Sequence, residues 1–127
     1  MQLTKEATSA TVYETLVTNL YRAVDAMDAP KVTSFVSENV IFRLGNFDML
    51  TGRGVFEDAN AGFFTTITAM HHTISGIWTC GDTVFCEGRV HYTRKNGTTH
   101  EVPFSTRLKF DHGLICEYIV FVDISGL

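Results

Sequence analysis

His91 and Asp123 are side chains of this chain that could move protons at neutral pH, and Arg89 could assist them by orienting a substrate. An imidazole titrates near neutrality, and a carboxylate in an apolar pocket can serve as a general acid or base. An arginine can polarise a substrate oxygen, or it can simply pair with a nearby acid such as Glu87. Together in one pocket, these groups would suit proton transfer on a carbonyl or an epoxide.

The dipeptide Asn96-Gly97 predicts the direction in which the side chains of Arg89 and His91 point. It separates two predicted strands, 83–95 and 98–111, and is the strongest short-range signal for a two-residue type I′ turn. The side chains that this turn directs inward from the first strand are Phe85, Glu87, Arg89 and His91. The side chains that it directs outward are Val84, Cys86, Val90 and Tyr92. Read alone, the first strand would send its charged residues to solvent, but the turn places them on the core face of the second strand.

The turns on either side predict the faces of the flanking strands. A type II′ turn at Gly81-Asp82 directs His72, Ile74 and Trp78 inward and places His72 opposite His91.

The loop at 111–113 leaves the face of Asp123 open. A three-residue loop with a left-handed Gly113 turns Tyr118 and Val122 inward, whereas a two-residue loop turns Asp123 inward. Turn chemistry favours the three-residue loop and an outward Asp123.

The N-terminal half predicts helices that cover this sheet. Residues 11–27 repeat apolar side chains at helical spacing, and Asp28 suits the N-cap of a short second helix. A strand over 40–44 and a third helix over 55–67 follow. Helices first and a long meander afterwards predict one α+β domain over 1–127, with a pocket between the helices and a curved sheet.

Composition narrows the partners. A net charge of −4 without a basic run argues against nucleic acid or an anionic membrane. The three cysteines lack metal-ligand spacing, and no run approaches the ~18 apolar residues of a membrane span. His72, His91 and Asp123 would be too far apart on the sheet to share a metal. We expect a cytoplasmic protein with no metal and a hydrophobic small molecule as its ligand.

The two-helix opening and several short motifs follow a pattern found in one family. The motifs are Gly52-Arg53-Gly54, Met70-His71-His72-Thr73-Ile74, Trp78, Asn96-Gly97, Pro103-Phe104 and Val120-Phe121-Val122-Asp123. In them, nearly the whole chain resembles the SnoaL-like polyketide cyclase family of the nuclear transport factor 2-like superfamily. The resemblance implies a cone-shaped barrel, in which a curved antiparallel sheet packs against three N-terminal helices. It is more specific for fold than for reaction.

Two relatives in that superfamily imply roles for single residues. Limonene epoxide hydrolase is similar in placing an Arg-x-Asp on an inner strand and a second Asp near the end of the last strand. Arg89, His91 and Asp123 stand at those positions, so the resemblance implies an inward Asp123, which we adopt. Ketosteroid isomerase has a catalytic tyrosine where Tyr21 falls, but its second acid would lie near Thr106, which is not an acid.

These features predict a small cofactor-independent cyclase, isomerase or hydrolase acting on a hydrophobic carbonyl or epoxide compound. Asp123 and His91 would move protons and Arg89 would orient the substrate; alternatively, Asp123 caps the sheet and His91 packs in the core. The residues expected to bind the substrate are Tyr21, His72, Trp78, Phe47, Phe64 and Phe104. The same sequence also fits a non-catalytic pocket for an apolar molecule, or a homodimer formed through the outward set of Val84, Cys86, Val90 and Tyr92.

Overall fold

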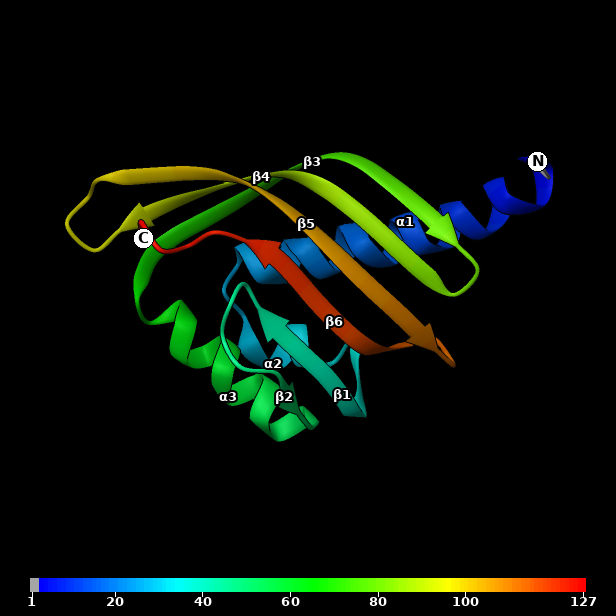
Figure 1. Ribbon diagram of the computed structural model, residues 1–127, viewed down its shortest axis with the longest axis horizontal. Coiled ribbons are helices and arrows are strands. Elements are labelled where there is room, and N and C mark those ends of the chain that lie inside the picture. Colours follow the sequence, from blue (N-terminus) through cyan, green and yellow to red (C-terminus); the bar gives the residue numbers. More distant parts are fainter. Residues whose placement is uncertain (1–2) are drawn as a thin grey trace.

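The computed structural model describes residues 3–127, with side chains from residue 12 onward. Within this range, three helices accompany a six-stranded sheet (Figure 1). The helices are α1 (Leu3–Asp25), α2 (Ala29–Thr33) and α3 (Arg53–Phe64). The strands are β1 (Val36–Leu44), β2 (Leu50–Thr51), β3 (Ile67–Cys80), β4 (Thr83–Arg94), β5 (Thr99–Asp111) and β6 (Leu114–Val122).

The sheet is mixed and open, with the strand order β2-β1-β6-β5-β4-β3. Strand β1 pairs with β6 in parallel and every other pairing is antiparallel, so the expectation of a wholly antiparallel sheet is wrong at this one pair. A parallel pair needs a crossover between its strands, and here α3 and the long β3–β5 meander supply it. The predicted α+β, cone-shaped architecture with three helices is confirmed.

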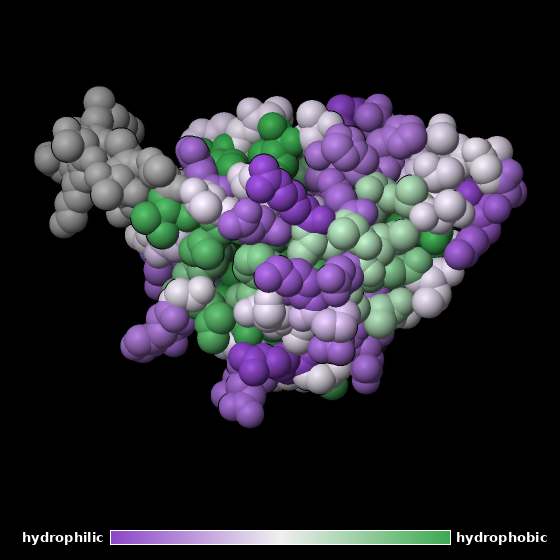
Figure 2. Space-filling view, turned by 180° about the vertical axis from the view of Figure 1, so that it is seen from behind, coloured by the Kyte–Doolittle hydropathy of each residue, from purple (hydrophilic) through white to green (hydrophobic). Residues whose placement is uncertain are grey.

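Helix α1 crosses behind the sheet in Figure 1 and packs against β3. Its apolar stripe is buried as the spacing predicts, with Val17 and Leu20 fully buried. Seen from behind, the molecule shows hydrophobic residues interspersed with hydrophilic ones (Figure 2). No helix within 3–127 is both long enough and apolar enough to span a bilayer.

The short connections of the helical half follow local rules. The carboxylate of Asp28 accepts a hydrogen bond from the backbone N–H of Lys31 at 3.1 Å, so the predicted N-cap of α2 is confirmed. The guanidinium of Arg53 donates to the carbonyl of Val36 at 2.8 Å, which ties the start of α3 to β1. These contacts set α3 beside β1, where the two elements enclose a cavity.

The β4–β5 hairpin differs from the prediction by one residue. Its loop holds three residues, 95–97: Arg94 N–H donates to the Thr98 carbonyl at 2.8 Å, and Gly97 takes the left-handed conformation at φ +85°. This is the type I turn with a left-handed glycine, which replaces the expected type I′ turn. Because side chains alternate along a strand, the shift exchanges the two faces of β4.

The inward placement predicted for Glu87, Arg89 and His91 is therefore wrong, since all three are exposed. The set predicted to face outward, Val84, Cys86, Val90 and Tyr92, is buried at 0 to 2% exposure. That set cannot form a dimer interface, because it belongs to the core. A homodimer as such stays a prediction.

The β3–β4 turn is confirmed as a two-residue loop, with positive φ at Gly81. Trp78 pairs with Phe85 as this turn predicts, but because the faces of β4 are exchanged, Trp78 lies outward at 55% exposure, where an inward position was predicted. A bulge between Ile74 and Gly76 then shifts the register of the rest of β3. The Trp78 ring covers the Cα of Gly76, where a Cβ would come within 2.3 Å of the indole. His72 does point inward, but it lies opposite Val90 and not His91.

The β5–β6 turn combines features of both predicted loops. It holds two residues, and both His112 and Gly113 have positive φ, the type I′ pattern. A bulge between Lys109 and Phe110 then changes the register, so Tyr118 is buried and Asp123 is exposed. The inward Asp123 that the resemblance implied is wrong. The three-residue loop that turn chemistry favoured is also wrong, and Asp123 faces outward, the direction predicted from that loop, because of the bulge.

Candidate active site

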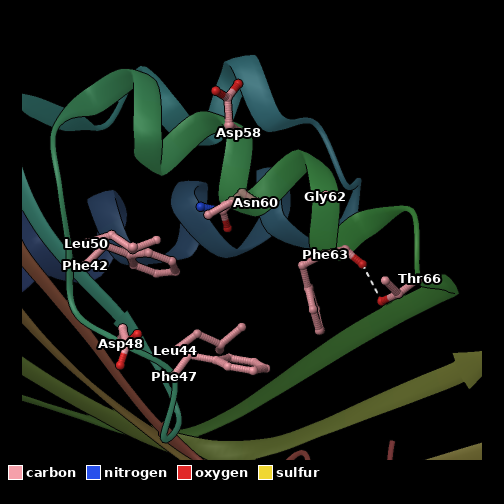
Figure 3. Close-up of a pocket in the computed structure, with 11 residues that line it drawn as sticks. Phe42, Leu44, Phe47, Asp48, Leu50, Asp58, Asn60, Gly62, Phe63 and Thr66 are labelled. Carbon is pink, nitrogen blue, oxygen red and sulfur yellow. Dashed lines mark hydrogen bonds between the residues drawn. The ribbon is translucent and has the colours of Figure 1, made fainter.

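An apolar cavity of about 360 Å³ lies between α3, β1 and the loop after β1 (Figure 3). Its walls are the side chains of Phe42, Leu44, Phe47, Leu50 and Phe63. We call it the outer cavity. Its volume falls in the range of about 300–1,000 Å³ that is usual for small-molecule sites.

A smaller space of about 40 Å³ adjoins the outer cavity on the side of α1. The two share Phe42, Leu44, Asn60 and Phe63 in their walls. The smaller space, which we call the inner cavity, adds four side chains with polar atoms: Tyr21, His72, Tyr92 and Tyr118. A molecule held in the apolar outer cavity would thus meet polar groups at the inner end.

A buried cluster of hydroxyl and thiol groups stands behind the inner cavity. The hydroxyl of Tyr21 on α1 is hydrogen-bonded to that of Thr106 on β5. Cys86 on β4 lies opposite Thr106, with its Sγ 3.0 Å from Thr106 Oγ1 and 3.8 Å from the Tyr21 oxygen. Tyr118 on β6 also hydrogen-bonds with Tyr21. The cluster joins α1 to the three central strands.

Burial keeps this cluster in its neutral form. It raises the pKa of Tyr21 well above 10, and the neighbouring Tyr118 and Cys86 raise it further. Burial is likewise the main cause that raises the pKa of Cys86 and that of Tyr118. Tyr21 therefore keeps its proton at neutral pH and is suited to donating a hydrogen bond, not to acting as a base.

His72 is held from behind by Asp25, the last residue of α1. The imidazole Nδ1 lies 2.6 Å from Asp25 Oδ1, and the backbone N–H of His72 donates to Oδ2 at 3.0 Å. The carboxylate fixes the tautomer with the proton on Nδ1 and leaves the lone pair on Nε2. Among residues 12–127, no side chain or backbone group pairs with Nε2.

Aromatic rings fix the imidazole plane. The His72 ring centroid lies 4.7 Å from that of Tyr21 and 4.9 Å from that of Phe104, and the His72 side chain is only 8% exposed. A helix C-terminus disfavours a carboxylate, so Asp25 at this position needs the compensation that His72 provides. The result is a part-buried acid–imidazole pair beside a buried phenol.

The residues predicted to bind substrate fall into three groups. Tyr21, His72 and Phe64 line the inner cavity, and Phe47 lines the outer cavity. Phe104 packs behind Tyr21 and His72. Trp78 lines neither cavity and lies on the outer face of the sheet.

The residues predicted to be catalytic lie on the other side of the sheet. Arg89 pairs with Glu101 at 3.4 Å, and not with Glu87. The carboxylate of Asp123 accepts hydrogen bonds from the hydroxyl and backbone N–H of Ser125, which lower the pKa of Asp123. His91 is exposed. None of Arg89, His91 and Asp123 borders the inner cavity, so these side chains share no enclosed site in which they could transfer a proton.

Sequence reasoning missed two polar residues of the site. Asp25 follows Tyr21 by four positions, and Asn60 follows Phe56 by four, so each lies on the buried stripe of its helix. A polar residue that interrupts an apolar stripe was the available signal. Tyr21 and Thr106 stand at the positions that the ketosteroid isomerase resemblance gave for a tyrosine and an acid, and their hydroxyl groups are hydrogen-bonded to each other.

A family model described as a SnoaL-like domain matches residues 17–118. No curated protein sequence matches the chain.

Solved structures match at low identity and high structural similarity. A protein with a ketosteroid isomerase-like fold from Catenulispora acidiphila, solved with trimethylamine, is 20% identical, with a TM-score of 0.80 over 87% of this chain and 86% of that one. A candidate polyketide cyclase from Xanthomonas campestris is 19% identical, with a TM-score of 0.78 over 92% and 94%. An LEH-like epoxide hydrolase from M. tuberculosis is 14% identical, with a TM-score of 0.74 over 86% and 80%. At these identities the likeness shows the fold alone.

Proposed function

The chain belongs to the SnoaL-like domain family, and from this premise we propose that it is a small cyclase or isomerase that moves a proton on an apolar carbonyl compound. The observation that carries the proposal is the part-buried His72–Asp25 pair, which leaves Nε2 free beside the buried hydroxyl of Tyr21. The similarity to a candidate polyketide cyclase supports it. No cofactor is needed for this chemistry.

His72 acts as the general base in this proposal. Its Nε2 takes a proton from the carbon next to the substrate carbonyl, and the C–H electron pair moves into the new C=C bond of an enolate. Asp25 stabilises the imidazolium that forms, because its carboxylate accepts the Nδ1–H bond at 2.6 Å. General-base catalysis of this kind contributes about 10²–10⁴ in rate.

Tyr21 holds the oxygen that becomes negative. Its raised pKa keeps the phenol protonated, and Thr106 and Tyr118 fix the position of its hydroxyl. A preorganised donor in a water-poor site stabilises an oxyanion more than water does. The imidazolium of His72 then returns the proton to another carbon in an isomerisation. In a cyclisation, the enolate carbon attacks a second carbonyl carbon, and the resulting alkoxide takes the proton.

Exchange of carbon-bound protons for deuterium tests this proposal without the natural substrate. The probe is 2-tetralone, an apolar ketone, incubated with the protein in D₂O and followed by proton NMR. We expect the protein to accelerate exchange next to the carbonyl and His72→Ala to reduce the protein's contribution at least about 100-fold. The matched control is His91→Ala, because His91 is an exposed histidine that lines neither cavity.

Two results would contradict the proposal. One is equal exchange in His72→Ala and the unaltered protein; the other is no acceleration by the unaltered protein. Tyr21→Phe, which keeps the ring, should slow exchange by about 100-fold or more, as expected for the loss of one oxyanion donor.

A non-catalytic pocket for an apolar molecule is the second candidate. The apolar walls of the outer cavity and the small volume of the inner cavity, about 40 Å³, favour it. Binding of 2-tetralone with no acceleration of exchange would support this second function.

A further inference from the structure

Asn60 stands where the two cavities meet. It lies on α3 and lines both the outer and the inner cavity. The other polar side chains around the outer cavity are Asp48, Asp58 and Thr66. Asp48 and Asp58 are exposed, and Figure 3 shows Asp58 pointing away from the cavity. The Thr66 hydroxyl already donates to the Phe63 carbonyl at 2.6 Å. Asn60 is thus the polar group that a molecule meets between the apolar walls and the inner cavity.

The amide orientation of Asn60 is fixed by one contact. Its Nδ2 donates to the carbonyl of Phe56, one turn earlier on α3, at 2.8 Å. Only the amide nitrogen can donate to a carbonyl, so this contact places Oδ1 on the other side, and Figure 3 shows that oxygen toward the cavity. No donor within residues 12–127 reaches Oδ1.

An amide oxygen accepts hydrogen bonds and cannot donate them. A ligand hydroxyl placed beside Asn60 would therefore be bound, whereas an ether or carbonyl oxygen at the same place would be repelled. The Phe42 and Phe63 rings on either side suit a flat apolar ring system that carries such a hydroxyl.

We infer that Asn60 is a specificity-determining residue that selects substrates with a hydroxyl on an apolar ring system, at the junction of the two cavities. This rests on the proposed function and narrows it, because the substrate class becomes hydroxylated aromatic or polycyclic ketones. The ring system occupies the outer cavity, the hydroxyl donates to Asn60 Oδ1, and the reacting carbonyl reaches Tyr21.

Binding of simple aromatic probes tests this inference without turnover. The probes are 2-naphthol, whose hydroxyl donates, and 2-methoxynaphthalene, whose ether oxygen only accepts; binding is measured by calorimetry or ligand-detected NMR. We expect the protein to bind 2-naphthol about five- to tenfold more tightly, the value of one neutral hydrogen bond.

Substitutions at Asn60 give the decisive comparison. Asn60→Leu removes the acceptor, and leucine favours a helix, so the variant should fold and its preference for 2-naphthol should fall to about onefold. Asn19→Leu is the matched control, because Asn19 is an exposed asparagine on α1, and it should keep the preference.

Three results would overturn the inference: no preference in the unaltered protein, an unchanged preference in Asn60→Leu, or binding of neither probe. Failure of the proposed catalysis is seen separately, as equal deuterium exchange in His72→Ala. The naphthol preference should survive in His72→Ala, so the two failures are distinguishable.

Discussion

The hydrogen bond between Tyr21 and Thr106 should be measurable as a coupling free energy. The perturbations are Tyr21→Phe and Thr106→Val, singly and together. Each removes one hydroxyl and nearly preserves side-chain shape, so neither opens a cavity. Both residues are buried, at 5% and 0% exposure, so water cannot replace a lost partner.

The magnitude follows from what each change leaves behind. Thr106→Val removes the partner of Tyr21 and the 3.0 Å contact to Cys86 Sγ, but the Tyr21 hydroxyl keeps its contacts with Tyr118 and Cys86. The Tyr21 hydroxyl therefore keeps polar partners, and we expect each single variant to lose about 1–2 kcal/mol of unfolding free energy. The shared bond is counted in both single variants, so the double variant should lose about 1 kcal/mol less than their sum.

Urea denaturation followed by far-UV circular dichroism measures these free energies. A loss of about 1 kcal/mol should lower Tm by about 3–5 °C for a domain of this size. The matched control is Thr99→Val on the same strand, where an exposed threonine should change stability by no more than about 0.5 kcal/mol. Additive losses, within about 0.3 kcal/mol, would refute a bond between the two hydroxyls.

Three further predictions concern stability. Burial raises the pKa of Tyr92 from 10 in the unfolded chain to about 12, so the folded state retains this proton to higher pH. The contribution of Tyr92 to the unfolding free energy should therefore fall by up to about 1.4 kcal/mol per pH unit between pH 10 and 12, and Tyr92→Phe should reduce the total slope in urea titrations by that amount. Gly62→Ala should raise the unfolding free energy by about 0.5–1 kcal/mol, because nothing lies within 4 Å of the new Cβ on α3. Gly88→Ala should instead lower the unfolding free energy by more than about 2 kcal/mol, because the new Cβ would come within 1.9 Å of a backbone oxygen. Equal thermal stability of the two alanine variants would contradict these two predictions. Asp28→Ala should lower the unfolding free energy by about 1 kcal/mol, because the N-cap hydrogen bond of α2 is lost. An unchanged urea midpoint would show that this hydrogen bond does not stabilise the protein.

Local sequence signals predicted the elements of the fold well. The helical spacing over 11–27, the N-cap at Asp28 and the glycine-containing turns each depend on a few neighbouring residues, so they can be identified without knowledge of the rest of the chain. The resemblance then supplied the arrangement of these elements, and the family match confirms it. What local signals cannot supply is the exact register between strands.

The β4–β5 register shows why. An Asn-Gly dipeptide fits both a two-residue type I′ loop and a three-residue loop that ends on a left-handed glycine, and the two differ little in energy. The predicted register would expose Val84, Val90 and Tyr92, at a cost on the order of 5 to 10 kcal/mol. It would also bury three ionisable side chains. The alternation of apolar and polar residues along β4 predicts the observed faces, but the turn was given more weight than this alternation.

Tyr21 was expected inward from the α1 stripe alone, and it lines the inner cavity. His72 also lines that cavity as expected, but only because the bulge between Ile74 and Gly76 offsets the exchanged faces of β4. Asp123 was misplaced because the resemblance was followed against the turn, and its observed direction depends on a bulge that turn length does not reveal.

The distribution of polar groups in the site follows from the cost of burying charge. The central strands contribute neutral groups to the interior, the Thr106 hydroxyl and the Cys86 thiol, which satisfy one another with Tyr21. A carboxylate on the same strands would lie in the core without a cation to pair with, at a cost of several kcal/mol. Asp25 avoids that cost because it lies at the end of α1, where its side chain is 22% exposed. Its carboxylate also accepts hydrogen bonds from the backbone N–H and the imidazole of His72. The fold can therefore hold an acid–imidazole pair at the edge of its core and a neutral donor within it, and proton transfer at a carbonyl requires both.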